Sequence, residues 1–198
     1  MPNSNLPRNS PADIDAASIA FAVEALRRGG VVAYPTEAVF GFGCDPGNKS
    51  ALRRLLTIKQ RAFDQGVLLI GSAFKQVAPY IAADCPDDAL DRARASWPGP
   101  HTWVFPRSEQ APDWIVGSHA GIALRVTAHP VAAALCQAFG TALVSTSVNR
   151  HGSEPARTGD AVEHEFGLLL DAIVAGKVGD AANPTSIRDA ISGEWLRR

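Results

Sequence analysis

The 198-residue sequence lacks an excess of either charge: 19 lysine and arginine side chains oppose 20 aspartates and glutamates, which gives a net charge of −1. A dedicated nucleic-acid-binding domain usually carries a clear basic excess. The bulk composition therefore argues against tight RNA binding and leaves only a local basic patch open. Hydrophobic residues make up 46% of the chain, enough to build the core of one domain.

Cysteine is scarce as well. The three cysteines, Cys44, Cys85 and Cys136, form no CxxC pair, so neither a disulfide framework nor a zinc site is predicted. No run of about 18 apolar residues occurs, so we expect no membrane-spanning helix. The polar N-terminus, MPNSNLPRNSPADID, has no apolar stretch of the kind a signal peptide needs. Together these absences predict a cytoplasmic protein.

Several common catalytic motifs are missing. There is no GxxxxGK(S/T) loop, which argues against a P-loop protein, and no GxSxG nucleophile elbow. The five histidines have no metal-ligand spacing, so each is expected to be a surface or structural residue. They are His101, His119, His129, His151 and His164. We therefore predict no metal site built from protein side chains.

The pattern of elements predicts a loose lead-in over residues 1–12 and one α/β domain over 13–198. Periodicity indicates a first helix ending near Arg28 and further helices at 50–59, 74–81, 86–96, 130–139 and 160–166. Apolar runs indicate strands at 31–34, 67–70, 102–105, 121–127, 141–146 and 169–174, with a glycine-bearing loop at 41–48 and a closing hairpin over 186–197. Helices thus alternate with a sheet expected to be mixed parallel and antiparallel.

A lysine falls on the buried side of the predicted second helix. Leu52, Leu55 and Leu56 form its apolar stripe, and Lys59 lies three residues further on the same face. A charge there needs a partner or a water-filled cleft. Arg61 adds a rigid donor suited to phosphate at the helix end. An anionic ligand explains the pair; the alternative is a snorkelling lysine beside a solvated arginine.

Hydroxyl and amide side chains end the apolar strand at 141–146. Alternate residues of an extended chain face the same side, so Ser145, Ser147 and Asn149 are expected to converge. Such neutral groups hydrogen-bond sugars, bases or phosphates. The alternative is an ordinary turn rich in serine and asparagine.

An arginine interrupts another apolar strand. Arg125 lies inside Gly121–Val126, where a guanidinium needs a carboxylate or a phosphate. The pattern leaves open whether the protein or a ligand supplies it. A weaker signal is the segment 34–37, in which Thr36 and Glu37 end the first strand. All these clusters lie at strand ends or in loops, where ligands of open α/β sheets bind.

Together these segments are similar to the threonylcarbamoyl-AMP synthases of the TsaC/YrdC-like type, in the short single-domain form. The resemblance runs from about residue 15 to Arg198. Its carrying segments are AYPTEAVFGFGCDP at 33–46, KQR at 59–61, WPGPHTWVFP at 97–106, LRVTAHP at 124–130, STSVN at 145–149 and NPTSIRD at 183–189. The resemblance implies a twisted mixed sheet with helices packed on it and an open cleft.

The resemblance also implies roles for particular residues. The nucleotide-binding positions of the family match Lys59, Arg61, Ser147, Asn149 and Arg197, of which the first two are the expected catalytic pair. The positions around the amino acid match Thr36, Arg125, Ser145 and Thr185. Three positions depart from residues that many relatives carry: Ala38 replaces a threonine, Ala62 a proline, and Ile70 a histidine that many longer relatives have. Contacts made by that threonine and histidine cannot be carried over.

The reaction implied by the resemblance joins L-threonine, bicarbonate or CO2, and ATP into threonylcarbamoyl-AMP, with Mg²⁺ held mainly by the ATP phosphates. The product would serve a separate transferase complex that forms N6-threonylcarbamoyladenosine in tRNA, and a weak direct contact with tRNA stays open. The alternative of another class is a non-catalytic module that binds tRNA or double-stranded RNA, which should carry more positive charge. A non-catalytic nucleotide sensor is a further alternative.

Overall fold

The computed structural model describes residues 14–183 and 185–197, so the expected lead-in at 1–12 lies outside the described residues. The helices are α1 (Ala16–Arg27), α2 (Lys49–Lys59), α3 (Phe74–Val77), α4 (Asp87–Ser96), α5 (Asp113–Val116), α6 (Pro130–Phe139) and α7 (Gly159–Phe166). Short 3-10 turns are η2 (Phe63–Gln65), η3 (Ala78–Tyr80) and η4 (Gly167–Leu169). None of the helices in the described part of the chain is long and apolar enough to span a bilayer.

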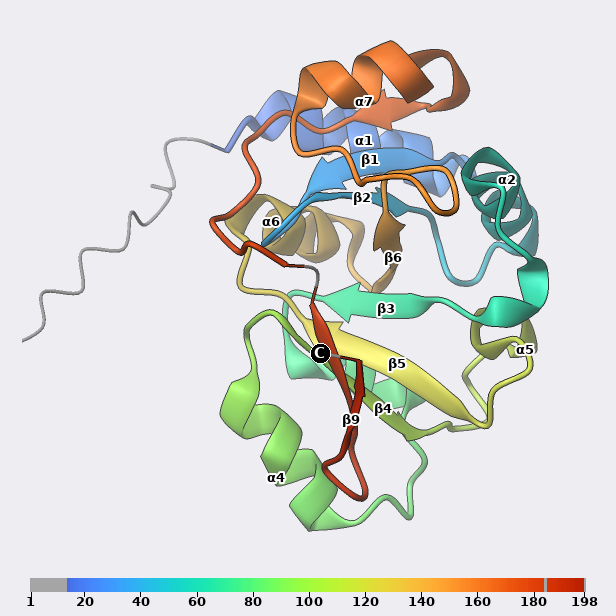
Figure 1. Ribbon diagram of the computed structural model, residues 1–198, viewed down its shortest axis with the longest axis vertical. Helices are drawn as coiled ribbons and strands as arrows, with labels where there is room; N and C mark the ends of the chain where they lie inside the picture. The colour runs from blue at the N-terminus through green and yellow to red at the C-terminus, as the bar shows by residue number, and fades with distance from the viewer. Residues whose placement is uncertain (1–13, 184, 198) are drawn as a thin grey trace, which may run out of the picture.

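One twisted sheet runs through the molecule (Figure 1). Its strands are β1 (Val32–Pro35), β2 (Phe40–Gly43), β3 (Leu68–Gly71), β4 (His101–Pro106), β5 (Gly121–Val126), β6 (Leu143–Ser147), β7 (Ala172–Ile173), β8 (Ser186–Asp189) and β9 (Trp195–Arg197). Their order is β7-β1-β2-β6-β3-β5-β4-β8-β9. Parallel pairs, such as β3 with β5, occur beside antiparallel ones, such as β3 with β6. The predicted mixed α/β fold is confirmed.

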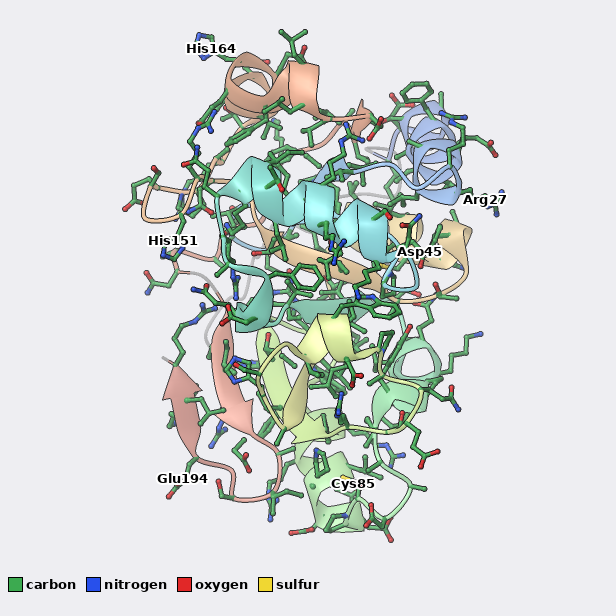
Figure 2. The ribbon with its side chains drawn as sticks, turned by 90° about the vertical axis from the view of Figure 1, so that its right-hand side faces the viewer. Arg27, Asp45, Cys85, His151, His164 and Glu194 are labelled. Atoms are coloured by element: carbon green, nitrogen blue, oxygen red, sulfur yellow. The ribbon has the colours of Figure 1, made fainter. Side chains whose placement is uncertain are left out.

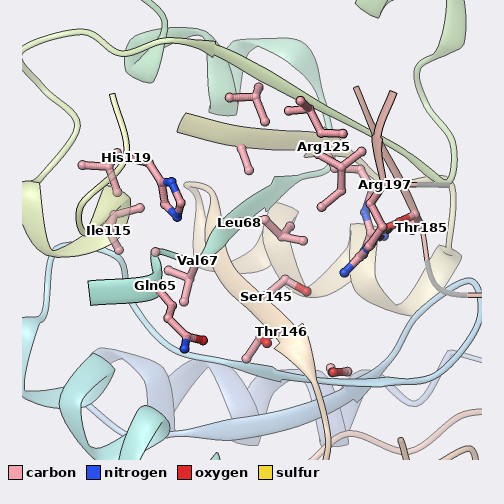
Figure 3. Close-up of a pocket in the computed structure, with 18 of the residues that line it drawn as sticks. Gln65, Val67, Leu68, Ile115, His119, Arg125, Ser145, Thr146, Thr185 and Arg197 are labelled. Carbon is pink, nitrogen blue, oxygen red and sulfur yellow. Dashed lines mark hydrogen bonds between the residues drawn. The ribbon is translucent and has the colours of Figure 1, made fainter. Parts of the chain in front are cut away.

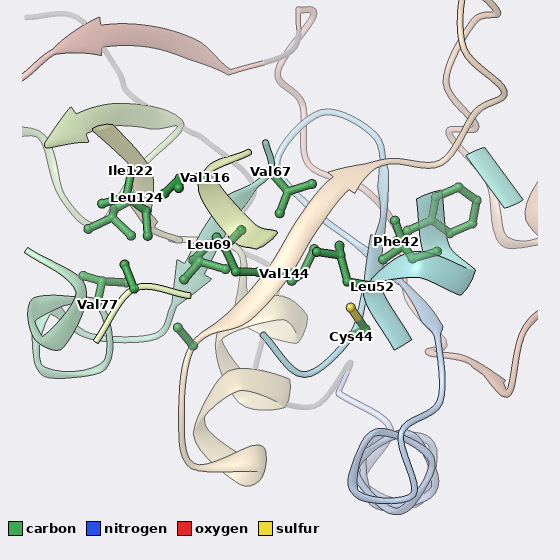
Figure 4. Close-up of a cluster of buried hydrophobic side chains, with 14 of the residues drawn as sticks. Phe42, Cys44, Leu52, Val67, Leu69, Val77, Val116, Ile122, Leu124 and Val144 are labelled. Carbon is green, nitrogen blue, oxygen red and sulfur yellow. The ribbon is translucent and has the colours of Figure 1, made fainter. Parts of the chain in front are cut away.

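Alternation along the strands divides the buried side chains between the two faces of the sheet. In β3, Leu69 belongs to the larger core, which α2, α4, α5 and α7 help to form (Figure 4). The next residue, Ile70, belongs to a second core with residues of α1 and α6. Helices therefore cover both faces. The second face matters most for function, because α1 and α6 leave part of it open.

The predicted loop at 41–48 is partly wrong, because residues 40–43 form β2 between β1 and β6. In its Phe-Gly-Phe-Gly sequence, the two glycines have low intrinsic strand preference. Tertiary packing requires the glycines: a Cβ on Gly43 would lie 2.6 Å from Tyr34 Cε1 and 3.1 Å from the Val144 carbonyl oxygen. Two smaller differences concern α5, which the sequence did not predict, and the strand expected at 169–174, which is only the two-residue β7.

Candidate active site

A cavity of about 540 Å³ opens on the sheet face that α1 and α6 leave uncovered. Its floor comes from residues in register across three strands: Leu68 of β3 pairs with Ala123 of β5 and with Ser145 of β6. Paired residues of neighbouring strands project from the same face, and the small side chains of Ala123 and Ser145 leave space above them. The volume lies within the range of about 300–1,000 Å³ typical of small-molecule sites.

The cavity has two chemically different ends (Figure 3). Arg125, Arg197 and Thr185 lie together at one end, and Ile115 and His119 lie at the other. Val67, Val104 and Val116 add to the lining of the cavity. One end thus suits an anion with hydrogen-bonding groups, and the other suits a flat or apolar group.

Most residues singled out from the sequence line this one cavity. They are Thr36, Arg61, Arg125, Ser145, Ser147, Thr185 and Arg197. Lys59 and Asn149 are not in the lining but lie directly behind Ser147, to which Lys59 is hydrogen-bonded. The structure therefore brings together residues that lie between positions 36 and 197 of the sequence.

Lys59 is buried, as its place on the apolar stripe of α2 predicts, with 4% of its surface exposed. Its ammonium donates to neutral oxygens of the β6 end: Ser147 O at 2.7 Å, Ser147 Oγ at 3.2 Å and Asn149 Oδ1 at 2.5 Å. Burial, together with the nearby Arg61 charge, lowers the pKa of Lys59 to about 8. Within residues 14–183 and 185–197, the lysine is thus held by neutral oxygens and not by a carboxylate, so its charge can still act on an anion.

The end of β6 is organised around this lysine. Ser147 Oγ donates to Asn149 Oδ1 at 2.7 Å, and Asn149 Nδ2 donates to Ser153 O at 2.6 Å. These bonds fix the amide with its oxygen toward Lys59. The expected convergence of three side chains is therefore only partly right: Ser145 and Ser147 line the cavity, whereas Asn149, beyond the strand end, faces Lys59.

Arg61 and Arg197 are two cations that line the same cavity. Gln60, in the left-handed conformation with φ of 55°, ends α2 and redirects the chain before Arg61. Arg61 donates to Gly66 O at 2.8 Å, and Arg197 donates to Thr185 O at 2.9 Å. Burial lowers the pKa of each, and Arg197 lowers that of Arg61 further. Among residues 14–183 and 185–197, neither arginine forms an ion pair.

The structure shows which group supplies an anion to Arg125, a question that the sequence left open. Its Nη2 lies 3.6 Å from Glu37 Oε2, so the protein itself supplies a carboxylate. The guanidinium nevertheless lines the cavity, and its buried Nε has no hydrogen-bond partner among the described residues. The arginine is thus charge-balanced but retains free donors.

Thr36 and Thr185 both line the cavity. Thr36 Oγ1 donates to Val39 O at 2.7 Å in the turn between β1 and β2, and Thr185 Oγ1 lies 3.4 Å from Thr102 Oγ1.

Of the three positions that depart from the family pattern, Ala38 lines the cavity, whereas Ile70 is buried in the core beneath α6. Ala62 precedes η2.

No pattern in the sequence pointed to the apolar end of the cavity. Ile115 and Val116 lie on α5, which was not predicted, and valines and isoleucines are common core residues. His119 was expected at the surface; it is exposed, but it also borders the cavity. Only the tertiary structure shows that these residues share a cavity with the arginines.

The described part of the chain holds no group of three or more histidines, cysteines or acidic residues that could ligate a metal ion. His151 and His164 are exposed, and both lie at the surface (Figure 2). His129 is buried as the N-cap of α6, and its Nε2 lies 3.0 Å from Lys177 O. These histidines therefore occupy the surface and structural roles predicted for them.

Comparison with known proteins gives consistent matches along the chain. The family model of Sua5, YciO and YrdC, described as "Telomere recombination", matches residues 24–198. A protein named threonylcarbamoyl-AMP synthase from Halorhodospira halophila is 54% identical over 173 residues, 87% of this chain and 90% of that protein. One of the same name from Coxiella burnetii is 52% identical over 180 residues, 91% of this chain and 96% of that protein.

A solved structure described as P. abyssi Sua5 complexed with L-threonine has a TM-score of 0.80 and 29% sequence identity to this chain. The match covers 86% of this chain but only 50% of that protein, so the chain spans about half the length of this structural relative. The family model, the two relatives and the shared fold agree. The chain therefore belongs to the Sua5–YciO–YrdC family.

Proposed function

We propose that this chain is a threonylcarbamoyl-AMP synthase, which joins L-threonine, bicarbonate or CO2, and ATP into threonylcarbamoyl-AMP with release of pyrophosphate. Relatives of about half identical sequence over nearly the whole chain carry that name. The observation that carries the proposal here is the gathering of Arg61, Arg125 and Arg197 on one cavity. Three guanidiniums on one cavity, one of them already balanced by a protein carboxylate, suit a highly anionic substrate together with a smaller carboxylate.

The chemistry requires positioning and charge neutralisation more than a covalent nucleophile. The amine of threonine attacks CO2 with loss of a proton, or bicarbonate with loss of water, and in both cases gives a carbamate. A carbamate oxygen then attacks the α-phosphorus of ATP, and the bond to the bridging oxygen breaks. Pyrophosphate leaves with that electron pair, so protein cations near the phosphates would stabilise the charge that develops on it.

The geometry supports a division of the cavity between the two substrates. Lys59 and Arg61, with Ser147 and Asn149 holding the lysine, would face the triphosphate, and Arg197 would add a third cation. Arg125, with Thr36, Ser145 and Thr185 near it, would hold the threonine carboxylate and hydroxyl. The apolar end would accept the adenine base.

The side chains that line the cavity also indicate how a Mg²⁺ ion would be held. The described lining residues include hydroxyls and guanidiniums but no aspartate or glutamate, so they fit a Mg²⁺ ion held by ATP phosphates and water, the usual arrangement for this cation with nucleotides. When bound, the ion would neutralise phosphate charge. The protein cations would share that task.

The product would pass to a separate transferase complex that modifies an adenosine of tRNA. The alternative of a non-catalytic RNA-binding module is not favoured, because the relatives named here are synthases. A cavity with one apolar and one cationic end also suits a nucleotide better than a duplex backbone, which is usually bound along an extended basic surface.

Activity provides the direct test. Purified protein with ATP, Mg²⁺, L-threonine and bicarbonate should release pyrophosphate and form threonylcarbamoyl-AMP, identified by mass spectrometry. Omission of either threonine or bicarbonate should reduce pyrophosphate release to background, because the attacking carbamate forms only from both. Release that is independent of threonine would contradict the proposal.

The pH dependence of ATP binding should report the protonation of Lys59. Its pKa of about 8 means that the free protein carries this charge below about pH 8 and loses it above. Above pH 8 the protonated fraction of Lys59 falls by about tenfold per pH unit. ATP affinity, measured by calorimetry without threonine, should fall in parallel, by about tenfold per pH unit. In Lys59→Met this fall should disappear. An unchanged pH dependence in the variant would remove Lys59 from the ATP site.

A further inference from the structure

Glu37 is a buried carboxylate beside the cavity that the reaction scheme leaves without a role. It follows the cavity residue Thr36 in the turn after β1, and only 8% of its surface is exposed. It is absent from the cavity lining. A buried carboxylate is costly unless it is paired, so its partners indicate what it does.

The two oxygens of the Glu37 carboxylate have different surroundings. Oε1 accepts from Thr127 Oγ1 at 2.7 Å and from the Ala128 amide at 3.1 Å, both immediately after β5. Oε2 faces Arg125 and has no hydrogen-bond partner among the described residues. One oxygen therefore anchors the carboxylate to the chain, and the other presents charge to the guanidinium.

The contact with Arg125 balances charge without consuming the donors of the arginine. The distance of 3.6 Å between Nη2 and Oε2 is too long for a hydrogen bond. A guanidinium has five N–H donors in a fixed plane, and Arg125 Nε is buried without a partner in the described structure. Such an arginine can still make a bidentate contact with a carboxylate ligand in the cavity.

Glu37 also holds the elements around this arginine together. Its backbone oxygen accepts from the Ala181 amide at 3.1 Å, and the Thr36 oxygen accepts from the Gly179 amide at 2.9 Å. A Cβ on Gly179 would lie 2.7 Å from the Glu37 oxygen, so the segments are in close contact. The residue thus joins the turn after β1, the end of β5 and the segment around 179–181.

The carboxylate is charged at neutral pH. Burial by itself would raise the pKa of Glu37, but the Arg125 charge and the hydrogen bonds from Thr127 and Ala128 outweigh it, and the pKa is lowered overall. A permanent negative charge therefore lies behind the guanidinium.

We propose that Glu37 is a positioning residue for Arg125, holding the guanidinium in place so that its free donors receive the carboxylate of the amino-acid substrate. This inference rests on the proposed function, in which the cavity binds L-threonine. Glu37 itself does not touch the substrate. Its effect must therefore pass through Arg125, and a purely structural residue would show no such dependence.

The test is a double-mutant cycle of Glu37→Gln and Arg125→Ala, read by the separate affinities for L-threonine and ATP. The glutamine can still accept from Thr127 and Ala128 but places an uncharged group against Arg125. Glu37→Gln should weaken threonine binding by about 10- to 100-fold, which is the contribution of the charge-assisted hydrogen bond that Arg125 would make to the substrate carboxylate. ATP affinity should change by less than about twofold. In the Arg125→Ala background the same change should have almost no further effect.

Matched variants complete the design. Glu165, which pairs with Arg150 at 3.3 Å on the surface, is the control, and Glu165→Gln should leave both affinities unchanged. If Glu37→Gln does not fold, Thr127→Val removes one anchor of the carboxylate without changing any charge, and it should weaken threonine binding selectively but less.

Two results would overturn the positioning role: a parallel loss of threonine and ATP affinity, or an equal effect of Glu37→Gln with and without Arg125. If the wild-type protein binds no threonine and releases no pyrophosphate, the proposed function itself fails, and this inference with it. The wild-type measurement therefore separates the two failures.

Discussion

Lys59→Ala should lower turnover by about 100- to 1,000-fold, the usual effect of removing one preorganised charge donor from an active site. The ammonium lies at the end of α2, bound to oxygens of Ser147 and Asn149 and, among the described residues, to no carboxylate. In the proposed role, its charge stabilises the ATP phosphates and the pyrophosphate as it leaves. Steady-state pyrophosphate release at saturating ATP and threonine measures the effect.

A folding control makes this result interpretable. Loss of Lys59 leaves several oxygens of the β6 end without their donor, so Lys59→Met, which retains most of the buried chain, should accompany Lys59→Ala in thermal unfolding. Arg53→Ala alters an exposed residue of the same helix and should be nearly silent. Near-normal turnover of folded Lys59→Ala, or a loss explained entirely by unfolding, would contradict the proposed role.

Arg125→Ala should weaken L-threonine binding by about one to two decades and leave ATP binding nearly unchanged. A hydrogen bond to a charged group contributes about 1.5–3 kcal/mol, and the free donors of Arg125 point to the carboxylate as its ligand. Calorimetry with each substrate separately gives the comparison. Equal losses for both ligands would count against a specific role for Arg125.

The ion pair with Glu37 affects how this variant behaves. Removal of Arg125 leaves a carboxylate with 8% exposure without its cation, and breaking a buried pair commonly costs about 3–5 kcal/mol of stability. Arg125→Ala alone should therefore have a lower melting temperature. The double variant with Glu37→Gln should recover part of that stability while binding threonine as weakly as Arg125→Ala, which separates binding from folding.

Local spacing in the sequence was enough to place several of these residues. The helical period put Lys59 on the face of Leu52 and Leu56, and its burial confirms this. Strand alternation likewise put Ser145 and Ser147 on one face, and both line the cavity. These predictions succeed because the direction of a side chain within a regular helix or strand depends only on the local backbone geometry.

Other features depended on packing between distant segments. Strand β2 was missed because its alternating glycines have weak strand preference, and it is held by pairing with β1 and β6. The sequence left the partner of Arg125 open, since Glu37 is 88 positions away and a pattern does not determine which carboxylate approaches a buried arginine. At the apolar end of the cavity, Ile115 is likewise indistinguishable in sequence from any other core isoleucine.

The sequence by itself determined the fold class, the family and the identity of the charged and polar residues at the cavity. The tertiary structure alone decided how they interact: Lys59 is held by neutral oxygens, Arg125 is balanced by Glu37, and Arg61 and Arg197 line one cavity without carboxylate partners in the described structure. The reason is physical. The state of a buried charge depends on its desolvation and on groups within a few ångströms, and chain folding brings those groups from positions far apart in sequence.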